Sequence, residues 1–237
     1  MNLILLFDDD FIDAQRVRLG GRRAAYVQAV HRAAVGDRLR VGRLNGRVGT
    51  GVVTALGENE LLMEEIVLDR DPPPPAPATL VLALPRPKGL RRVVQGVAAM
   101  GLKRIVLINS WRVEKSFWAS PALAAAALRE QLLLGLEQGA DTVLPTVDLR
   151  PRFKPFVEDE APALIEGSRA LLAHPPATLA CPHAVPGAVT LAIGPEGGFI
   201  PYEVELLCAH GFEAVSLGSR PLRVEHAVPA LLGRILG

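Results

Sequence analysis

The chain has 237 residues, of which 49% are hydrophobic and 22% charged, values typical of a folded globular protein rather than a disordered or fibrous one. Its longest apolar runs, such as Thr79–Leu84, are far shorter than the about 18 residues that span a bilayer, so no transmembrane helix is expected. The net charge of +1 does not indicate a polyanionic partner for the whole chain, and two cysteines cannot supply a disulfide framework. The N-terminal apolar run lacks a basic leader, which favours the cytoplasm.

Residues 1–70 predict a small β-rich barrel that carries one helix. Apolar residues at helical spacing favour a helix over Arg22–Ala34, and Asn45-Gly46 is typical of a tight hairpin turn. Four segments have the composition of strands: Leu3–Phe7, Arg38–Leu44, Arg47–Ala55 and Leu61–Leu68. Such a domain is small and poor in catalytic side chains, so a binding role is expected.

Prolines dominate residues 71–78. Neither a helix nor a strand ladder can pass through Pro72–Pro75 and Pro77, which favour an extended polyproline II conformation. The hydrophobic pattern also changes across this segment. We therefore predict a domain over residues 1–70, a linker over residues 71–78 and a second domain over residues 79–237.

Short apolar runs alternate with helical patterns after the linker. Strands are predicted over Leu80–Leu84, Arg104–Ile108, Ala170–His174, Val189–Ile193 and Ala214–Leu217. Helices are predicted over Gly89–Met100, Pro121–Gln138, Tyr202–His210 and Glu225–Leu236. This alternation is typical of an α/β domain with a parallel sheet. Ligands bind at the carboxyl ends of such strands, so the residues that follow Leu172, Ile193 and Leu217 are the first candidates for a site.

The cations are concentrated in two segments. Residues 16–47 contain nine arginines and one acid, and residues 86–115 contain eight lysines or arginines and one acid. Arginine makes up 22 of the 26 cations, and its guanidinium can bind phosphate with two parallel hydrogen bonds. The pattern is compatible with nucleic-acid binding, although by itself it is more often explained by solvated surfaces.

Two glycine-containing loops follow predicted strands. Gly194–Phe199 places three glycines around one carboxylate, and Gly218–His226 places two arginines and a carboxylate after a glycine turn. Neither loop matches a phosphate-binding or dinucleotide-binding glycine motif, and each can be read as an ordinary turn or helix start. Cys181 and His183, with Cys208 and His210, have a spacing tighter than usual zinc ligand pairs, so no metal site is expected.

Ile193–Phe199, followed by Gly211-Phe212 and Leu217–Ala227, resembles the paired signature of the SPOUT-class 16S rRNA (uracil-N3) methyltransferases, the RsmE family. Weaker likenesses cover most of the chain, at His31-Arg32 and Gly36-Asp37, Pro85–Lys88 and Glu137-Gln138. The chain departs from the family pattern at Ala99–Gly101, at Gly139–Asp141 and at His226, where the family has threonine.

The resemblance implies a SPOUT trefoil-knot methyltransferase domain, α/β with a parallel sheet, preceded by a small PUA-like RNA-binding β-barrel. It implies S-adenosylmethionine as cofactor, 16S ribosomal RNA of the small subunit as substrate, and a homodimer. Carried over by position, the cofactor-binding residues are Leu172, Ala173, His174, Ile193, Gly194, Pro195, Glu196, Gly197, Gly198, Leu217, Gly218, Ser219, Arg220 and Leu222.

Methylation at N3 of uracil requires removal of a proton, so a base is expected near the cofactor. Glu225 is favoured for this role and Glu196 is the alternative, with Arg223 or Arg220 stabilising charge on the uracil oxygens. The expected RNA-binding residues belong to the two basic segments: Arg16, Arg18, Arg22, Arg23, Arg32, Arg86 and Lys88.

Two other functions remain compatible with the sequence. One is a non-catalytic RNA-binding factor of ribosome assembly on the same fold, which the exchange at His226 keeps open. The other is a SPOUT methyltransferase that acts on a different RNA site or base atom. Cofactor binding separates the first from the main hypothesis, and the identity of the modified nucleoside separates the second.

Overall fold

The computed structural model describes residues 2–237. The chain forms two compact units, one made of Met1–Pro74 with Leu133–Leu144 and the other of Pro75–Leu132 with Pro145–Gly237. The boundary near Pro74 lies inside the predicted proline-rich linker. No helix within residues 2–237 is both long and apolar enough to cross a membrane.

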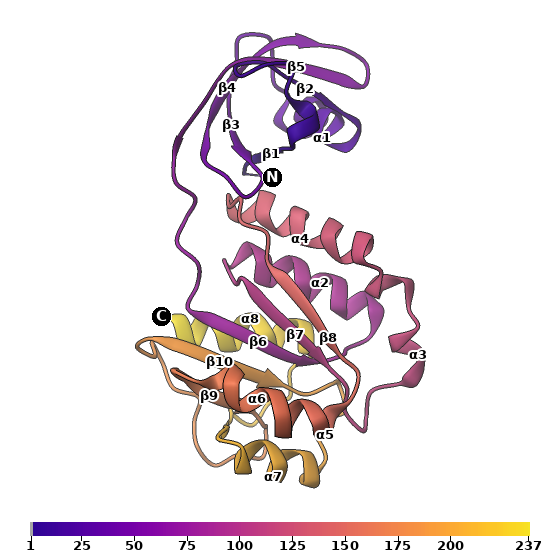
Figure 1. The fold of residues 1–237 in the computed structure, drawn as a ribbon, viewed down its shortest axis with the longest axis vertical. Coiled ribbons are helices and arrows are strands. Elements are labelled where there is room, and N and C mark those ends of the chain that lie inside the picture. Colours follow the sequence, from indigo (N-terminus) through magenta and orange to yellow (C-terminus); the bar gives the residue numbers. More distant parts are fainter. Residues whose placement is uncertain (1) are drawn as a thin grey trace. The chain divides into compact units, whose positions relative to one another are not determined.

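The first unit contains a strongly curved sheet of five strands around one apolar core (Figure 1). The strand order is β1-β3-β4-β5-β2, with β1 and β3 parallel and the other pairs antiparallel. The strands are β1 (Ile4–Leu6), β2 (Val17–Gly20), β3 (Arg38–Arg43), β4 (Val48–Leu56) and β5 (Glu60–Arg70). Successive residues of the edge strand β2 alternate between the core and the solvent, since Val17 and Leu19 are buried while Arg18 and Gly20 are exposed.

The predicted hairpin and helix of this unit are confirmed. The turn between β3 and β4 contains Asn45 and Gly46, and Asn45 adopts a φ of 57°, which asparagine tolerates better than most residues. The helix begins as α1 (Gly21–Tyr26) and continues through a wider turn, η2 (Val27–His31). It ends at Arg32, which is left-handed with a φ of 52°, so it is shorter than the predicted Arg22–Ala34.

Residues 133–144 join the first unit, which the prediction of an uninterrupted second domain over residues 79–237 did not include. They comprise the end of α4 (Ala125–Gly139) and the turn after it. Leu133 and Leu136 are buried in a core cluster with Leu3 and Leu5. The backbone N–H of Leu3 donates to the Glu137 carbonyl over 3.1 Å. The closing part of α4 is thus an integral part of the barrel's packing.

The second unit is an α/β layer structure around a six-stranded sheet in which every neighbouring pair is parallel, as predicted. The order is β11-β9-β10-β6-β7-β8. Its strands are β6 (Ala78–Ala83), β7 (Arg104–Ile108), β8 (Thr146–Arg150), β9 (Ser168–Ala173), β10 (Ala188–Ile193) and β11 (Glu213–Val215). The edge strand β8 was not predicted, because charged residues alternate along it.

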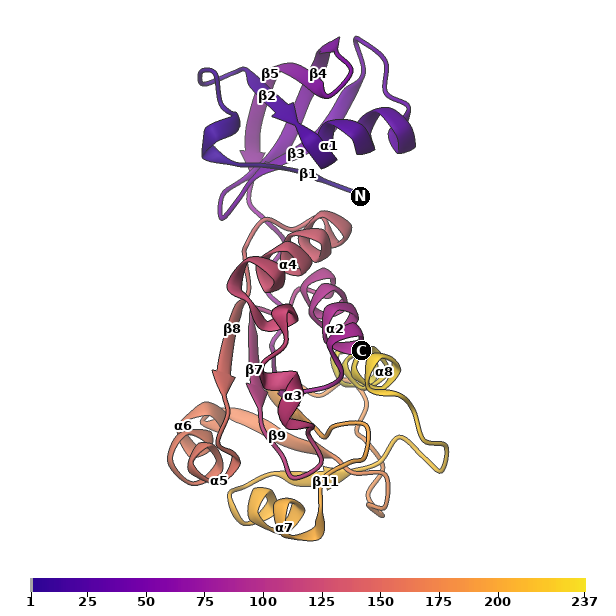
Figure 2. The same ribbon diagram turned by 90° about the vertical axis from the view of Figure 1, so that its right-hand side faces the viewer.

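Helices cover both faces of this sheet. Figure 2 shows α2 (Pro87–Ala99) and α8 (Val224–Leu236) on one side, with α5 (Phe153–Pro155) and α6 (Ala161–Ile165) on the other. Two more helices, α3 (Lys115–Trp118) and α7 (Pro201–Ala209), follow the carboxyl ends of β7 and β10. Because all six strands run the same way, the loops after them meet at one edge of the sheet.

Candidate active site

A cavity of about 280 Å³ lies at the carboxyl ends of β9 and β10. A smaller one of about 70 Å³, at the ends of β9 and β11, shares six of its lining residues. The shared residues come from the loops after β9 and β11 and from the start of α8: Ala173, His174, Pro175, Pro221, Leu222 and Ala227. Three loops far apart in the sequence therefore enclose one continuous region.

The loop after β10 depends on its glycines. The Gly198 N–H donates to the Pro195 carbonyl over 2.8 Å and closes a tight turn, in which Gly198 has a φ of 71°. A Cβ at Gly194 would lie 3.0 Å from the backbone nitrogen of Phe199, so a side chain there would force the loop apart. The turn exposes backbone groups along the cavity wall, which a side chain at these positions would cover.

Arg112 joins this loop from the β7–α3 connection, a residue that the sequence did not single out. Its guanidinium donates to the Gly197 carbonyl, and its side chain lines the larger cavity. A Cβ at Gly197 would lie 2.9 Å from Arg112 Cδ. The absence of a side chain at Gly197 therefore lets Arg112 pack against the loop.

The loop after β11 is tied to the loop after β9. Ser216 Oγ donates to the Pro175 carbonyl over 3.0 Å and accepts from the Gly218 N–H over 3.1 Å. Gly218 has a φ of 124°, a conformation that other residues rarely adopt. These contacts hold the two loops together around the smaller cavity.

Twelve of the fourteen residues expected at the cofactor line these two cavities. The exceptions are Leu172, which is fully buried within β9, and Ser219, which is exposed and lines neither cavity. The sequence missed several lining residues whose neighbours it had identified: Pro175, Pro176, Phe199, Val215, Ser216, Val224, Ala227 and Leu231.

The two candidate bases both come close to Gly89 in the first turn of α2. A Cβ at Gly89 would be 3.8 Å from Glu225 Oε2 and 3.9 Å from Glu196 Oε1. Glu196 accepts from the Arg86 backbone N–H over 3.0 Å and from Arg86 Nε over 3.3 Å. Glu225 pairs with Arg92 at 3.6 Å. The structure thus brings both carboxylates to one place beside the cavity.

Glu225 is held in its charged form. Its own backbone N–H, in the first turn of α8, lowers the pKa of the carboxyl, and the positive charges of His226, Arg223 and Arg92 lower it further. Partial burial opposes this effect without reversing it. The carboxylate can therefore accept a proton or a hydrogen bond at neutral pH.

His174, Arg220 and Arg223 complete the polar groups of the region. Burial lowers the pKa of His174, so its imidazole brings no positive charge to the cavity walls at neutral pH. Arg220 lines the smaller cavity. Arg223 precedes α8 and is exposed, with its charge close enough to affect Glu225.

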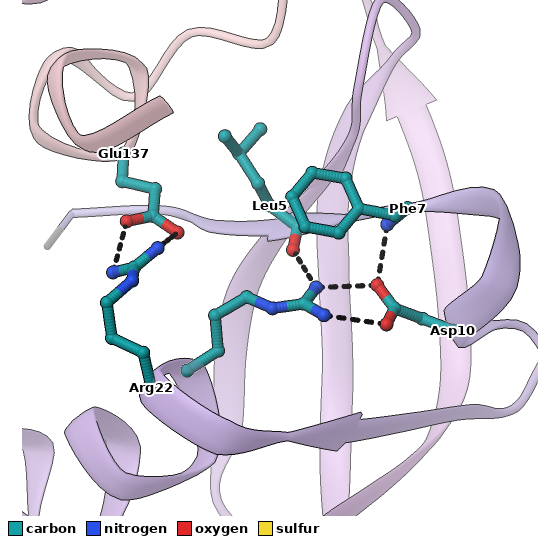
Figure 3. Close-up of polar contacts among 6 residues, drawn as sticks. Leu5, Phe7, Asp10, Arg22 and Glu137 are labelled. Carbon is teal, nitrogen blue, oxygen red and sulfur yellow. Dashed lines mark hydrogen bonds and ion pairs between the residues drawn. The ribbon is translucent and has the colours of Figure 1, made fainter. Parts of the chain in front are cut away.

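The residues expected to bind RNA have unequal freedom. Arg22 forms a double hydrogen bond with Glu137, and Arg23 does the same with Asp10 while stacking over Phe7 (Figure 3). The Arg23 side chain is only 13% exposed, so its expected role as a phosphate contact is replaced by a structural one in the barrel. Arg22 and the remaining five are exposed, but Arg16, Arg18 and Arg86 also form ion pairs on the surface, whereas Arg32 and Lys88 have no acidic partner within residues 2–237.

Cysteine and histidine side chains do not gather here. Within residues 2–237, no group of three or more histidine, cysteine, aspartate or glutamate residues is arranged to hold a metal ion. Cys181 is buried and Cys208 exposed.

Comparison with known proteins identifies similar chains. A family model described as an RNA methyltransferase domain matches residues 72–236. The ribosomal RNA small subunit methyltransferase E of Treponema pallidum is 27% identical over 241 residues, covering 100% of this chain and 91% of that protein.

Two solved structures share the fold of nearly the whole chain. One is a Legionella pneumophila protein described as a methyltransferase and solved with bound SAM, with a TM-score of 0.73 and 22% identity over 97% of this chain and 95% of that one. The other is a ribosomal RNA small subunit methyltransferase E of Neisseria gonorrhoeae bound to S-adenosyl methionine. It has a TM-score of 0.73 and 21% identity over 98% of this chain and 95% of that one.

Proposed function

The chain belongs to the RNA methyltransferase domain family, and on this premise we propose that it transfers the methyl group of S-adenosylmethionine to N3 of a uridine in 16S ribosomal RNA. The observation that carries the proposal is the cavity formed by the loops after β9, β10 and β11. The name of the Treponema pallidum relative and the ligands of the two solved structures support this choice of substrate and cofactor.

The cavity walls fit such a cofactor. Glycines at 194, 197 and 198 leave backbone groups accessible, and Leu222 and Ile193 offer apolar surface for a purine ring. The neutral His174 adds no cation where a positively charged sulfonium would have to lie. When bound, S-adenosylmethionine supplies an electrophilic methyl group.

Glu225 is the proposed base. Its carboxylate is ionised, lies beside the cavity and is held by Arg92, so it can take the proton of uracil N3–H. Its lowered pKa makes Glu225 a weak base, so removal of the N3 proton also requires stabilisation of the uracil anion by nearby arginines. Arg220 or Arg223 can stabilise negative charge on the uracil oxygens. Glu196, fixed by Arg86, is the alternative base.

RNA must present its target uridine unpaired, because N3 lies on the Watson–Crick edge. We propose that exposed cations bind the phosphates of the RNA: Arg16, Arg18, Arg32, Arg86 and Lys88. We assign the barrel of the first unit as the PUA-like RNA-binding domain and place the protein in the cytoplasm with its substrate.

A trefoil knot and a homodimer complete the proposal. The connection between β9 and β10 holds the C-terminal segment at two points, since Ala180 pairs with Ser216 and the Val185 N–H donates to the Ile235 carbonyl over 2.7 Å. Such a wrapped C-terminal segment supports a knotted topology, which is rare in proteins. Substrate would approach the cavity beside a second copy of the chain.

The test is to incubate the protein and S-adenosylmethionine with small ribosomal subunits that lack the modification, and to examine the digested RNA by mass spectrometry. We expect N3-methyluridine. A different methylated nucleoside would redirect the enzyme to another base atom. If the protein neither binds the cofactor nor transfers a methyl group to the RNA, the result would favour the non-catalytic RNA-binding factor.

A further inference from the structure

The loop between β7 and α3 presents an exposed tryptophan next to the cavity wall. Trp111 is 80% exposed, the highest value among the large hydrophobic side chains that the structure exposes within residues 2–237. The next residue, Arg112, lines the larger cavity. A single exposed apolar side chain is common on protein surfaces, so its significance depends on how the loop holds it.

The backbone of Trp111 is fixed although its ring is free. Its N–H donates to Glu203 Oε1 over 2.6 Å, and the other oxygen of Glu203 accepts from the Ile200 N–H over 3.0 Å. Glu203 is only 3% exposed. The buried carboxylate of Glu203 at the start of α7 thus holds the loop in place.

Two further contacts fix the loop on either side. Arg112 donates to the Gly197 carbonyl in the loop after β10. The Asn109 side chain accepts from Trp118 Nε1 over 2.9 Å. An aromatic ring on a backbone that is already ordered loses little conformational entropy when a ligand binds to it.

Two exposed cations follow Trp111 in the chain, Arg112 on the same loop and Lys115 at the start of α3, with one exposed acid, Glu114, between them. An aromatic side chain among cations is the combination with which proteins bind single-stranded nucleic acid, where a base stacks on the ring and phosphates contact the cations.

We propose that Trp111 is the surface on which an unpaired base of the RNA substrate stacks at the cavity mouth, in the segment that carries the target uridine. This inference rests on the proposed function, since it assumes an RNA substrate at this cavity. A second copy of the chain is a poorer occupant, because the neighbours of Trp111 are charged and the cores of protein interfaces are depleted in charged residues.

The test measures binding without cofactor, using a short oligouridylate and an abasic oligomer of the same length as probes. Trp111→Ala is expected to weaken oligouridylate binding by about 5-fold to 100-fold, the range found when a stacking aromatic is removed. Binding of the abasic oligomer, which offers phosphates alone, is expected to stay unchanged. Trp111→Phe is expected to restore most of the affinity.

Tryptophan fluorescence gives an independent readout, because the chain has two tryptophans. Oligouridylate is expected to quench the wild-type protein, and the quench is expected to disappear in Trp111→Phe, which retains Trp118. Tyr202→Ala is the matched control, since Tyr202 is an aromatic residue that is 50% exposed and lines neither cavity. It is expected to bind as the wild type does.

Three results would overturn the inference: unchanged oligouridylate binding by Trp111→Ala, an equal loss in Tyr202→Ala, or an equal loss of abasic-oligomer binding. Dissociation of an oligomer by Trp111→Ala in sedimentation would assign the ring to a second copy instead. Failure of the proposed function looks different, because oligouridylate would then bind and quench while no methyl group is transferred.

Discussion

The cations of residues 16–47 and those of residues 86–115 contact different kinds of partner. Seven of the nine arginines in the first segment pair with carboxylates of the barrel unit, leaving Arg32 and Arg40 without an acidic partner within residues 2–237. In the second segment, Arg86 and Arg92 pair with Glu196 and Glu225, the two carboxylates beside the cavity.

The difference shows that local charge density in a sequence does not measure charge available to a ligand. In the barrel, seven arginines are paired, six of them with acids more than ten residues away in sequence, and two pairs use acids that are largely buried. In the second unit, two of the eight cations, Arg86 and Arg92, are coupled to the carboxylates proposed to do the chemistry. Pairing within the first segment therefore leaves few arginines available to RNA, while two pairs of the second segment affect the charge of a site.

Removal of Arg23 is expected to have the largest effect. Its partner Asp10 has a side chain only 9% exposed, so Arg23→Ala leaves a nearly buried carboxylate without its cation. Breaking such a pair costs about 3–5 kcal/mol of unfolding free energy. Chemical denaturation measures this loss. Arg16→Ala, which breaks a pair exposed on both sides, is the control and should cost less than about 1 kcal/mol.

Glu225→Gln tests the charge of the second segment. We expect turnover to fall about 100-fold or more, because the amide cannot take the N3 proton, while S-adenosylmethionine affinity is kept. Single-turnover kinetics with excess cofactor measures the effect. Glu213→Gln, which removes an exposed acid paired with Arg169 in the same unit, should leave turnover unchanged. Equal turnover in Glu225→Gln would shift the role to Glu196 or to alignment alone.

Free and paired arginines of the barrel should differ in RNA binding. Arg32→Gln is expected to lower the slope of log affinity against log salt by about 0.7 to 0.9, the contribution of one phosphate contact. Arg38→Gln, whose cation already pairs with Glu65 at 2.8 Å, should lower the slope less. Equal slopes for the two variants would mean that pairing does not decide availability.

The pH dependence is expected to be the smallest effect. The pKa of Glu225 lies below its ordinary value of 4.5, first because of its own backbone N–H and then because of nearby cations. The ionised Glu225 therefore stabilises the folded state at pH values above 4.5, and this stabilisation is lost as the pH falls through the lower pKa of the folded state. The methyl-transfer rate should show no ionisation step from Glu225 between about pH 5 and 8. A step that Glu225→Gln removes would contradict this.

Much of the fold follows from local pattern. Apolar runs predict the four inner strands of the parallel sheet and its edge strand β11, and glycine after a strand locates two of the three cavity loops. The strands that escaped prediction, β2 and β8, lie at sheet edges, where charged residues occupy one face. The return of residues 133–144 to the barrel was not predictable, since Leu133 and Leu136 look like any helix core positions until Leu3 and Leu5 are placed beside them.

The candidate site shows the same limit. Gly194 and Gly218 could be found because their backbone geometry requires glycine, and a glycine directly after a strand is visible in the sequence. Arg112 and Trp111 carry no such mark, because their place at the site comes from contacts with Gly197 and Glu203, about 90 residues away. Arg23 was misread as an RNA contact for a related reason, since only the fold brings Asp10 to it.

The central claim is that the loops after β9, β10 and β11 form the S-adenosylmethionine site. The most direct test is calorimetric titration of that cofactor into the wild type, Gly197→Val and Gly96→Val. Gly96 lies in α2 with no atom near its missing Cβ, so its variant should bind like the wild type. Gly197→Val, which crowds the cavity wall at Arg112, is predicted to remain folded and to lose binding. Wild-type affinity in Gly197→Val would contradict the account.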